Sequence, residues 1–185
     1  MKLTKGTYKF YNIRGTNAVS ARNKSVYYML YHKTEFTHLF FMDSDMWFPK
    51  GTLEKLLSYD KDIAGGWYLR KRKGFYPTVF EIGSRTPHGF YKTIWPEGLI
   101  EVDAIGTGCL LIKREVLEKI EPPWFEYRVS GHPDQHMTTE DIVFCEKAKK
   151  KGFQIWCDGD IRCGHCNMFI IRPGETKGKK EIRPV

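Results

Sequence analysis

Two carboxylates stand together directly after an apolar run. Asp43 and Asp45 follow residues 39–42, whose sequence Leu-Phe-Phe-Met predicts a buried strand. Side chains two positions apart in an extended chain point to the same side, and two oxygen donors on one side suit Mg²⁺ or Mn²⁺ held jointly with a phosphate. Asp-x-Asp is also common in turns. Its place at the carboxyl end of a predicted strand, where open α/β sheets bind ligands, favours a cation site.

A second pair of acids begins a predicted helix. Glu140 and Asp141 follow two threonines and open a helical pattern over residues 140–151. Acids in a first turn complement the helix dipole and cap its free N–H groups, which is the structural interpretation. The functional interpretation is a general base, since a carboxylate can accept the proton of an attacking hydroxyl.

Three cysteines and a histidine gather near the last predicted strand. Cys157, Cys163 and Cys166, with His165, offer the ligand types of a structural zinc site. Their spacing lacks the paired Cys-x2-Cys knuckles of ordinary zinc modules. Zinc and an ordinary histidine of the surface or core are therefore both open.

Composition predicts one folded domain. The chain has 185 residues, 41% hydrophobic and 15% aromatic, which is enough for a real core. We expect a single domain over residues 1–172 and a basic tail over 173–185. No apolar stretch approaches the roughly 20 residues of a membrane span, no signal peptide is evident, and Cys109 and Cys145 lie in apolar patterns. These features favour a cytoplasmic protein with reduced thiols.

The net charge of +8 favours an anionic partner. Most basic clusters are interpreted as solvated faces. Residues 70–73, Arg-Lys-Arg-Lys, follow a Gly-Gly pair and are interpreted as a loop over a phosphate.

Apolar periodicity predicts an α/β fold, with strands and helices in alternation. A Gly-Thr-Gly turn at residues 106–108 is either a hairpin or a place where a sugar approaches the backbone. The expected strands cover residues 8–13, 37–42, 62–64, 100–105, 109–112 and 153–157, and the expected helices cover 18–31, 53–59, 114–120 and 140–151.

Several motifs in order carry a family resemblance. They are Ala-Arg-Asn at 21–23, the run from Phe40 to Met46, Gly-Thr-Gly and the strand after it at 106–112, the acid pair at 140–141, and Gly-His at 164–165. Over roughly residues 10–168 this set resembles the GT-A-fold nucleotide-sugar glycosyltransferases, especially the short family 2-like enzymes of phages and prokaryotes. The resemblance implies a Rossmann-related, mostly parallel central sheet flanked by helices.

The resemblance also implies roles for particular residues. Asp43, Asp45 and His165 would hold Mn²⁺ or Mg²⁺ on the donor diphosphate. Asp141 would be the catalytic base, with Glu140 as its neighbour. The remaining donor-binding residues would be Arg22, Trp67, Gly106, Thr107 and Gly108.

The implied reaction moves a sugar from a nucleoside-diphosphate sugar to a hydroxyl of a glycan, lipid or protein acceptor. Inversion at the anomeric carbon is expected, although one fold serves both stereochemical outcomes. Only about 20 residues precede the Ala-Arg-Asn motif, where the family has a strand and loop that hold the base. The chain is then a minimal enzyme, or it has lost that strand, or another copy or a partner chain completes the pocket.

Two other functions stay open. A non-catalytic module, derived from a transferase, would hold nucleic acid or acidic glycan through its basic surface. A zinc-stabilised nucleic-acid protein is the third reading. For a transferase, nucleic acid is not the expected partner.

Overall fold

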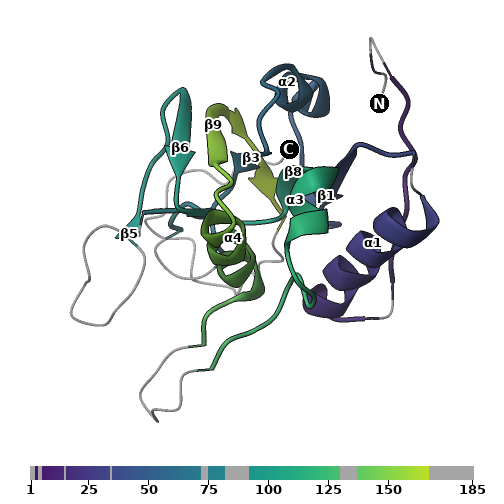
Figure 1. Cartoon of the computed structure of the whole chain (residues 1–185). Helices are drawn as coiled ribbons and strands as arrows, with labels where there is room; N and C mark the ends of the chain where they lie inside the picture. Colours follow the sequence, from purple (N-terminus) through teal and green to yellow (C-terminus); the bar gives the residue numbers. More distant parts are fainter. Residues whose placement is uncertain are drawn as a thin grey trace, which may run out of the picture.

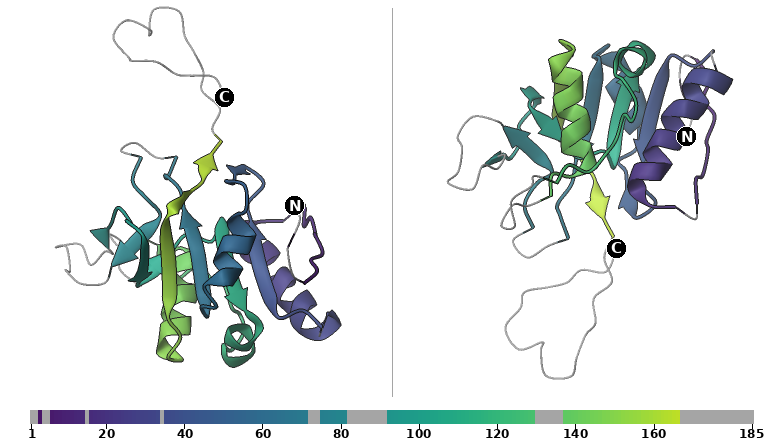
Figure 2. Two further views of the ribbon diagram at one scale, coloured as in Figure 1. Left: turned by 90° about the horizontal axis from the view of Figure 1, so that it is seen from above. Right: turned by 60° about the horizontal axis from the view of Figure 1, so that its bottom comes forward.

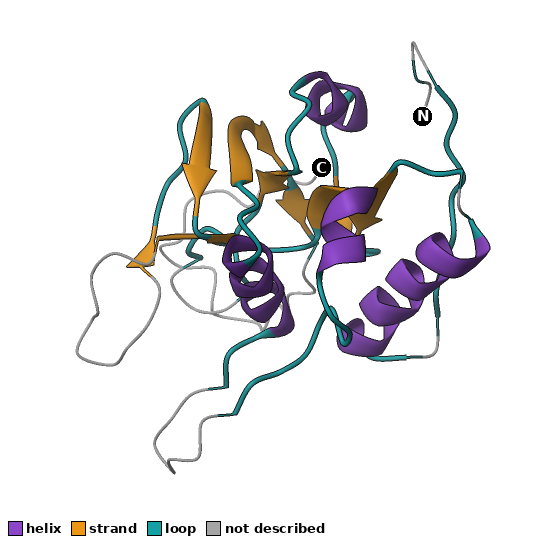
Figure 3. Cartoon of the chain, in the orientation of Figure 1, coloured by secondary structure: helices purple, strands orange, loops and turns teal. Residues whose placement is uncertain are grey.

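Helices and strands alternate along the chain (Figures 1 and 3). The computed structural model describes residues 3, 6–14, 16–33, 35–71, 75–81, 92–129 and 137–166. The predicted basic tail at 173–185 lies outside the described residues. The helices are α1 (Ala18–His32), α2 (Thr52–Ser58), α3 (Arg114–Lys119) and α4 (Glu140–Lys150).

The central sheet has five strands in the order β1-β8-β3-β9-β6. Only β3 and β9 pair in parallel; the other three pairings are antiparallel. The α/β class is confirmed, but a mostly parallel sheet is not, because a buried apolar run carries no information on strand direction. The strands are β1 (His38–Met42), β3 (Ile63–Trp67), β6 (Leu99–Val102), β8 (Cys109–Lys113) and β9 (Ile155–Arg162).

Three strands of this sheet nevertheless run in one direction. Strand β8 is antiparallel to both β1 and β3, so β1 and β3 share a direction, and β9 is parallel to β3. The carboxyl ends of β1, β3 and β9 and the amino end of β8 therefore lie at the same edge of the sheet. The motifs at residues 43–45, 106–108 and 164–165 adjoin these strand ends and therefore lie at this edge.

Two small sheets complete the fold: β5-β4-β7 and β10-β2. Strand β7 pairs with β4, whereas β8 pairs with β1 and β3, so the turn at 106–108 is not a hairpin. The turn carries the chain from a small sheet into the central one. The bounds of these strands are β2 (Met46–Trp47), β4 (Val79–Glu81), β5 (Lys92–Thr93), β7 (Ala104–Ile105) and β10 (Gly164–His165).

Helices cover both faces of the central sheet (Figure 2). Side chains alternate between the two faces along each strand. Ile63 and Ile112 belong to the core cluster that includes residues of α1, α3 and α4, whereas Ala64 and Leu111 pack with Leu53 of α2. The result is a layer of helices on each side of a buried sheet.

Local signals placed most elements correctly. Asn17 caps α1 by accepting a hydrogen bond from the Ser20 N–H at 2.8 Å. Gly152, with φ of 88°, follows the end of α4 as expected. The expected strand over residues 8–13 is wrong, since these residues form no strand and are exposed. Within the described residues, none of the helices has the length and apolar character needed to cross a membrane.

Candidate functional site

The candidate site lies where β1, β3 and β9 end. The Asp43 N–H, just after β1, donates to the Gly108 carbonyl, just before β8, at 3.1 Å. The Cys163 N–H, just after β9, donates to the Trp67 carbonyl at the end of β3, at 2.8 Å. These bonds hold the strand ends together and fix the backbone from which the candidate side chains project.

Arg22 of α1 reaches the first aspartate. Its Nη2 donates to both carboxylate oxygens of Asp43, at 2.9 and 3.1 Å, and its guanidinium lies 5.0 Å from the centre of the Phe41 ring. Arg22 is 7% exposed, and its buried Nε has no hydrogen-bond partner among the described residues. In the structure Arg22 pairs with Asp43, and its expected contact with the donor stays a prediction.

The second aspartate meets a lysine and a histidine. Oδ2 of Asp45 accepts a hydrogen bond from Nζ of Lys71 at 2.5 Å, and the same oxygen lies 3.4 Å from Nε2 of His165. Partial burial alone would raise the pKa of Asp45, but the hydrogen bond and charge of Lys71 outweigh it and lower that pKa. Asp45 is thus an ionised carboxylate beside two nitrogens.

A short strand pair positions His165. Strand β10 pairs with β2, which brings His165 opposite Met46, and the Cys166 N–H donates to the Asp45 carbonyl at 2.8 Å. Nδ1 of His165 lies 2.8 Å from the Leu69 carbonyl, which can only accept, so Nδ1 is the donor. In the neutral ring, Nε2 then carries the lone pair and faces Asp45. Metal-binding histidines commonly show this arrangement.

A metal ion would need several ligating side chains close together. The described residues contain no group of three or more His, Cys, Asp or Glu side chains arranged to hold one. Asp45 and His165 can supply one oxygen and one nitrogen, so the other ligands would have to be phosphate oxygens and water, as is usual for Mg²⁺ in nucleotide sites. The same finding gives no support to zinc held by Cys157, Cys163, Cys166 and His165.

The Gly-Thr-Gly turn packs against Tyr68. The Gly108 N–H donates to the buried Tyr68 hydroxyl at 3.1 Å. A Cβ on Gly106 would lie 2.6 Å from that hydroxyl oxygen, and one on Gly108 would lie 2.9 Å from the ring. Thr107 is 1% exposed. The glycines therefore permit close packing inside the protein, while their contact with a donor sugar stays a prediction.

Trp67 is also engaged inside the protein. It is buried, donates from Nε1 to the Gly159 carbonyl at 2.9 Å and meets Trp95 edge-on at 5.7 Å. These contacts explain the aromatic residue through packing, and its proposed place beside the sugar stays a prediction.

The acid pair opens α4 as expected. Oδ1 of Asp141 accepts hydrogen bonds from the Thr139 hydroxyl and from the Ile142 N–H, the latter at 2.9 Å. Burial, together with the charge of Asp141, raises the pKa of Glu140. A raised carboxyl pKa makes Glu140 a stronger proton acceptor near neutral pH.

Buried Tyr68 connects the acid pair with the strand ends. Burial is the main cause that raises the pKa of its hydroxyl, and the charges of Asp141 and Asp43 raise it further. Burial, followed by the charges of Glu140 and Asp141, raises the pKa of the hydroxyl of Tyr127, a residue that sequence reasoning missed. The charges of Asp141, Asp43 and Arg22 act on the Tyr68 hydroxyl and also on the Glu140 carboxyl. The acid pair of α4 therefore lies near the Asp43–Arg22 pair.

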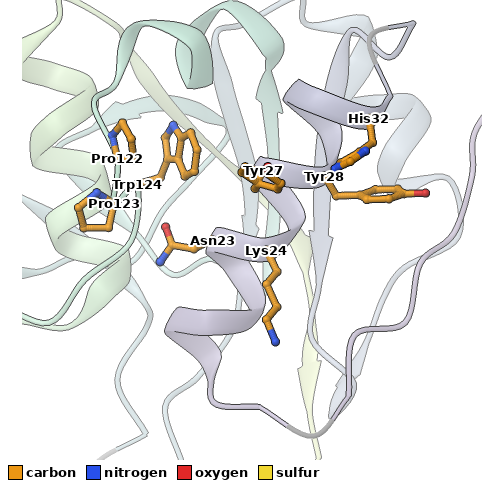
Figure 4. A pocket seen from close by; sticks show the side chains of 8 residues that line it. All are labelled: Asn23, Lys24, Tyr27, Tyr28, His32, Pro122, Pro123 and Trp124. Atoms are coloured by element: carbon orange, nitrogen blue, oxygen red, sulfur yellow. The ribbon is translucent and has the colours of Figure 1, made fainter.

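A separate groove is lined by residues of α1 and of the segment 122–124 (Figure 4). Its volume is about 770 Å³, and it contains no carboxylate. The Asn23 amide anchors this region by bonding the backbone of Phe125 in both directions, at 2.7 and 3.1 Å. The lining residues are Asn23, Lys24, Tyr27, Tyr28, His32, Pro122, Pro123 and Trp124.

The chain is similar in fold to a protein of known structure. No protein-family model and no curated protein matches the chain. Among solved structures, it is similar to A197 from STIV, with a TM-score of 0.54 and 20% sequence identity over 86% of this chain and 81% of that one. At this identity the match concerns architecture, and the chain shares its fold with that protein.

Proposed function

We propose that the protein is a metal-dependent glycosyltransferase of the GT-A type, which moves a sugar from a nucleoside-diphosphate sugar to an acceptor hydroxyl. The observation that carries the proposal is that Oδ2 of Asp45 and Nε2 of His165 lie 3.4 Å apart at the edge where three strands end. A second pair of acids, Glu140 and Asp141, lies near the Asp43–Arg22 pair, since the charges of Asp43 and Arg22 act on Glu140. The resemblance in motif order supports the same reading.

In the proposed inverting reaction, the acceptor oxygen attacks the anomeric carbon opposite the leaving diphosphate. A new carbon–oxygen bond forms, the bond to the diphosphate breaks, and Asp141 takes the proton of the hydroxyl. Glu140 orients its neighbour or the acceptor. A Mn²⁺ or Mg²⁺ ion held by Asp45, His165 and the donor would offset the charge that grows on the leaving diphosphate.

The Arg22–Asp43 pair would form the base of the donor-binding site. Asp43 is paired with an arginine whose side chain is only 9% exposed, whereas the lysine paired with Asp45 is 34% exposed, so Asp43 is less available to a cation than Asp45. Asp43 is therefore assigned to the donor ribose, or to the metal through water. Its side chain is 36% exposed, which leaves it accessible to a ligand.

Thermal shift tests the proposal. Nucleoside diphosphates and their sugars are screened with and without Mn²⁺, because a ligand of the native state raises the melting temperature by mass action. We expect at least one nucleotide to stabilise the protein only with Mn²⁺, and Asp45→Asn to abolish that shift. Stabilisation that is equal in Asp45→Asn would place the nucleotide elsewhere.

A binding module that holds acidic glycan or nucleic acid is the alternative. The groove on α1 favours it, since aromatic side chains with a lysine suit stacking and anion contact. Binding of such a polymer that Tyr27→Ala abolishes and Asp45→Asn does not affect would support this function.

A further inference from the structure

Lys71 occupies the face of Asp45 that a metal ion would use. Both the Lys71 ammonium and Nε2 of His165 contact the same oxygen, Oδ2 of Asp45, at 2.5 and 3.4 Å. A divalent ion bound between Oδ2 of Asp45 and Nε2 of His165 would lie beside the Lys71 ammonium. The two positive charges would then contact the same oxygen and repel each other strongly. The chain therefore holds a cation of its own at the place where the proposed function requires a metal ion.

Arg70 and Lys71 are held in different ways. Arg70 is fixed, because its Nη2 donates to the Thr93 hydroxyl at 3.1 Å and its guanidinium lies over the rings of Tyr76 and Phe80. Its N–H donates to the Tyr76 carbonyl at 2.9 Å, which closes the base of the loop. Lys71 follows this fixed base, and its side chain is 34% exposed. Exposed ion pairs are weak and exchange partners easily.

We propose that Lys71 is a built-in counter-cation of Asp45, which a divalent ion displaces and which then binds the donor's diphosphate. This inference rests on the proposed function, since it supplies the anion that receives Lys71. Without a diphosphate, the ion must displace the ammonium with no compensation. With a diphosphate, Lys71 gains a new anionic partner, so metal and diphosphate strengthen each other's binding. Lys71 is in this account a positioning residue of the donor site.

Manganese binding is the direct test. Isothermal titration compares Mn²⁺ binding to wild type, Lys71→Met and Lys71→Arg, without nucleotide. Lys71→Met should bind Mn²⁺ about three- to tenfold more tightly, because a competing charge is gone, and Lys71→Arg should stay close to wild type. Lys150→Met is the matched control, since Lys150 is exposed and about 15 Å along α4 from the acid pair. It should leave the affinity unchanged.

A second titration tests the transfer of Lys71 to phosphate. The probe is inorganic pyrophosphate as its manganese complex, which carries the anionic part of the donor. Lys71→Met should bind this complex about threefold or more weakly than wild type and Lys150→Met do, since it has lost one charged hydrogen bond. The change has the opposite sign to the change in Mn²⁺ affinity. A merely structural lysine would not produce this reversal.

Defined outcomes would overturn the inference. Equal Mn²⁺ affinity in wild type and Lys71→Met, or unaltered Mn²⁺ binding in Asp45→Asn, would show that Lys71 and the ion do not compete at Asp45. Unchanged binding of manganese pyrophosphate in Lys71→Met would remove the transfer step. If both titrations behave as expected while no nucleoside-diphosphate sugar binds, Lys71 exchange stands and the proposed transferase function fails.

Discussion

Nη2 of Arg22 donates to both carboxylate oxygens of Asp43, and this contact ties α1 to the end of β1. The arginine is buried, whereas the aspartate is partly exposed. The pair therefore neutralises a charge inside the protein and also presents a fixed carboxylate to the candidate site. The buried ring of Phe41 beneath the guanidinium holds it in place.

Replacing Arg22 with Met should destabilise the protein. The substitution retains an apolar side chain but leaves Asp43 without its partner, and we expect a loss of about 1–2 kcal/mol in the free energy of unfolding. Urea denaturation measures this loss. Asp43→Asn should cost much less in the Arg22→Met background than in wild type, and strictly additive losses would show that the two residues do not interact.

Gly106 should tolerate no side chain. In Gly106→Ala the new Cβ would lie 2.6 Å from the Tyr68 hydroxyl oxygen and 2.9 Å from Cβ of Thr78, so the surrounding structure must shift. Overpacking of this kind typically costs about 1–3 kcal/mol. Thermal denaturation should show the loss, and Tyr68→Phe, which removes the nearer atom but also the acceptor of the Gly108 N–H, should cost less in the Gly106→Ala background than in wild type. A Gly106→Ala variant as stable as wild type would contradict the packing described here.

Local sequence signals predicted the elements well but not how they pair. The cap at Asn17 and the glycine after α4 place those helix ends because each acts within a few residues. Strand direction depends on contacts between distant segments, so the antiparallel insertion of β8 between β1 and β3 could not be seen. The expected strand at residues 8–13 had the right side chains, yet the structure pairs it with no other strand.

The sequence predicted which residues belong to the candidate site, but not which of them contact one another. The pattern after β1 identified the two aspartates, and the structure brings His165 to Asp45 from the far end of the domain. The basic run 70–73 is interpreted from sequence as a loop over a phosphate, but nothing in the sequence links Lys71 to Asp45. Buried Tyr68 was missed altogether, since its role depends on the glycine turn of another strand.

Glu140 should give the protein a pH-dependent stability. Burial, followed by the charge of Asp141, raises the pKa of Glu140 in the folded state above its usual 4.5. Such a carboxyl destabilises the native state once it is ionised, so its contribution grows less favourable as pH rises from the unfolded to the folded pKa. Glu140→Gln should therefore melt at a higher temperature than wild type near pH 7, and the difference should vanish below about pH 4.5. A difference that is independent of pH would contradict the raised pKa.

His165→Gln should weaken Mn²⁺ binding less than Asp45→Asn does. The imidazole is a neutral ligand, whereas the carboxylate supplies the charge that attracts the ion. We expect about a tenfold loss or more, on the scale seen when single groups around a metal site are removed. Electron paramagnetic resonance of free Mn²⁺ measures both variants. No loss in His165→Gln would leave the histidine with only its structural bond to Leu69.

Sugar transfer by Asp141→Asn tests the central claim most directly. The amide can still accept the capping bonds of Thr139 and Ile142 but cannot take a proton at neutral pH. With the nucleotide sugar and Mn²⁺ that stabilise the wild type, the variant should bind the donor with unchanged affinity and lose transfer by about 10²-fold or more. Glu140→Gln should lose less. Transfer by Asp141→Asn at the wild-type rate, with Glu140→Gln inactive, would move the base to Glu140; full transfer by both variants would contradict catalysis at this acid pair.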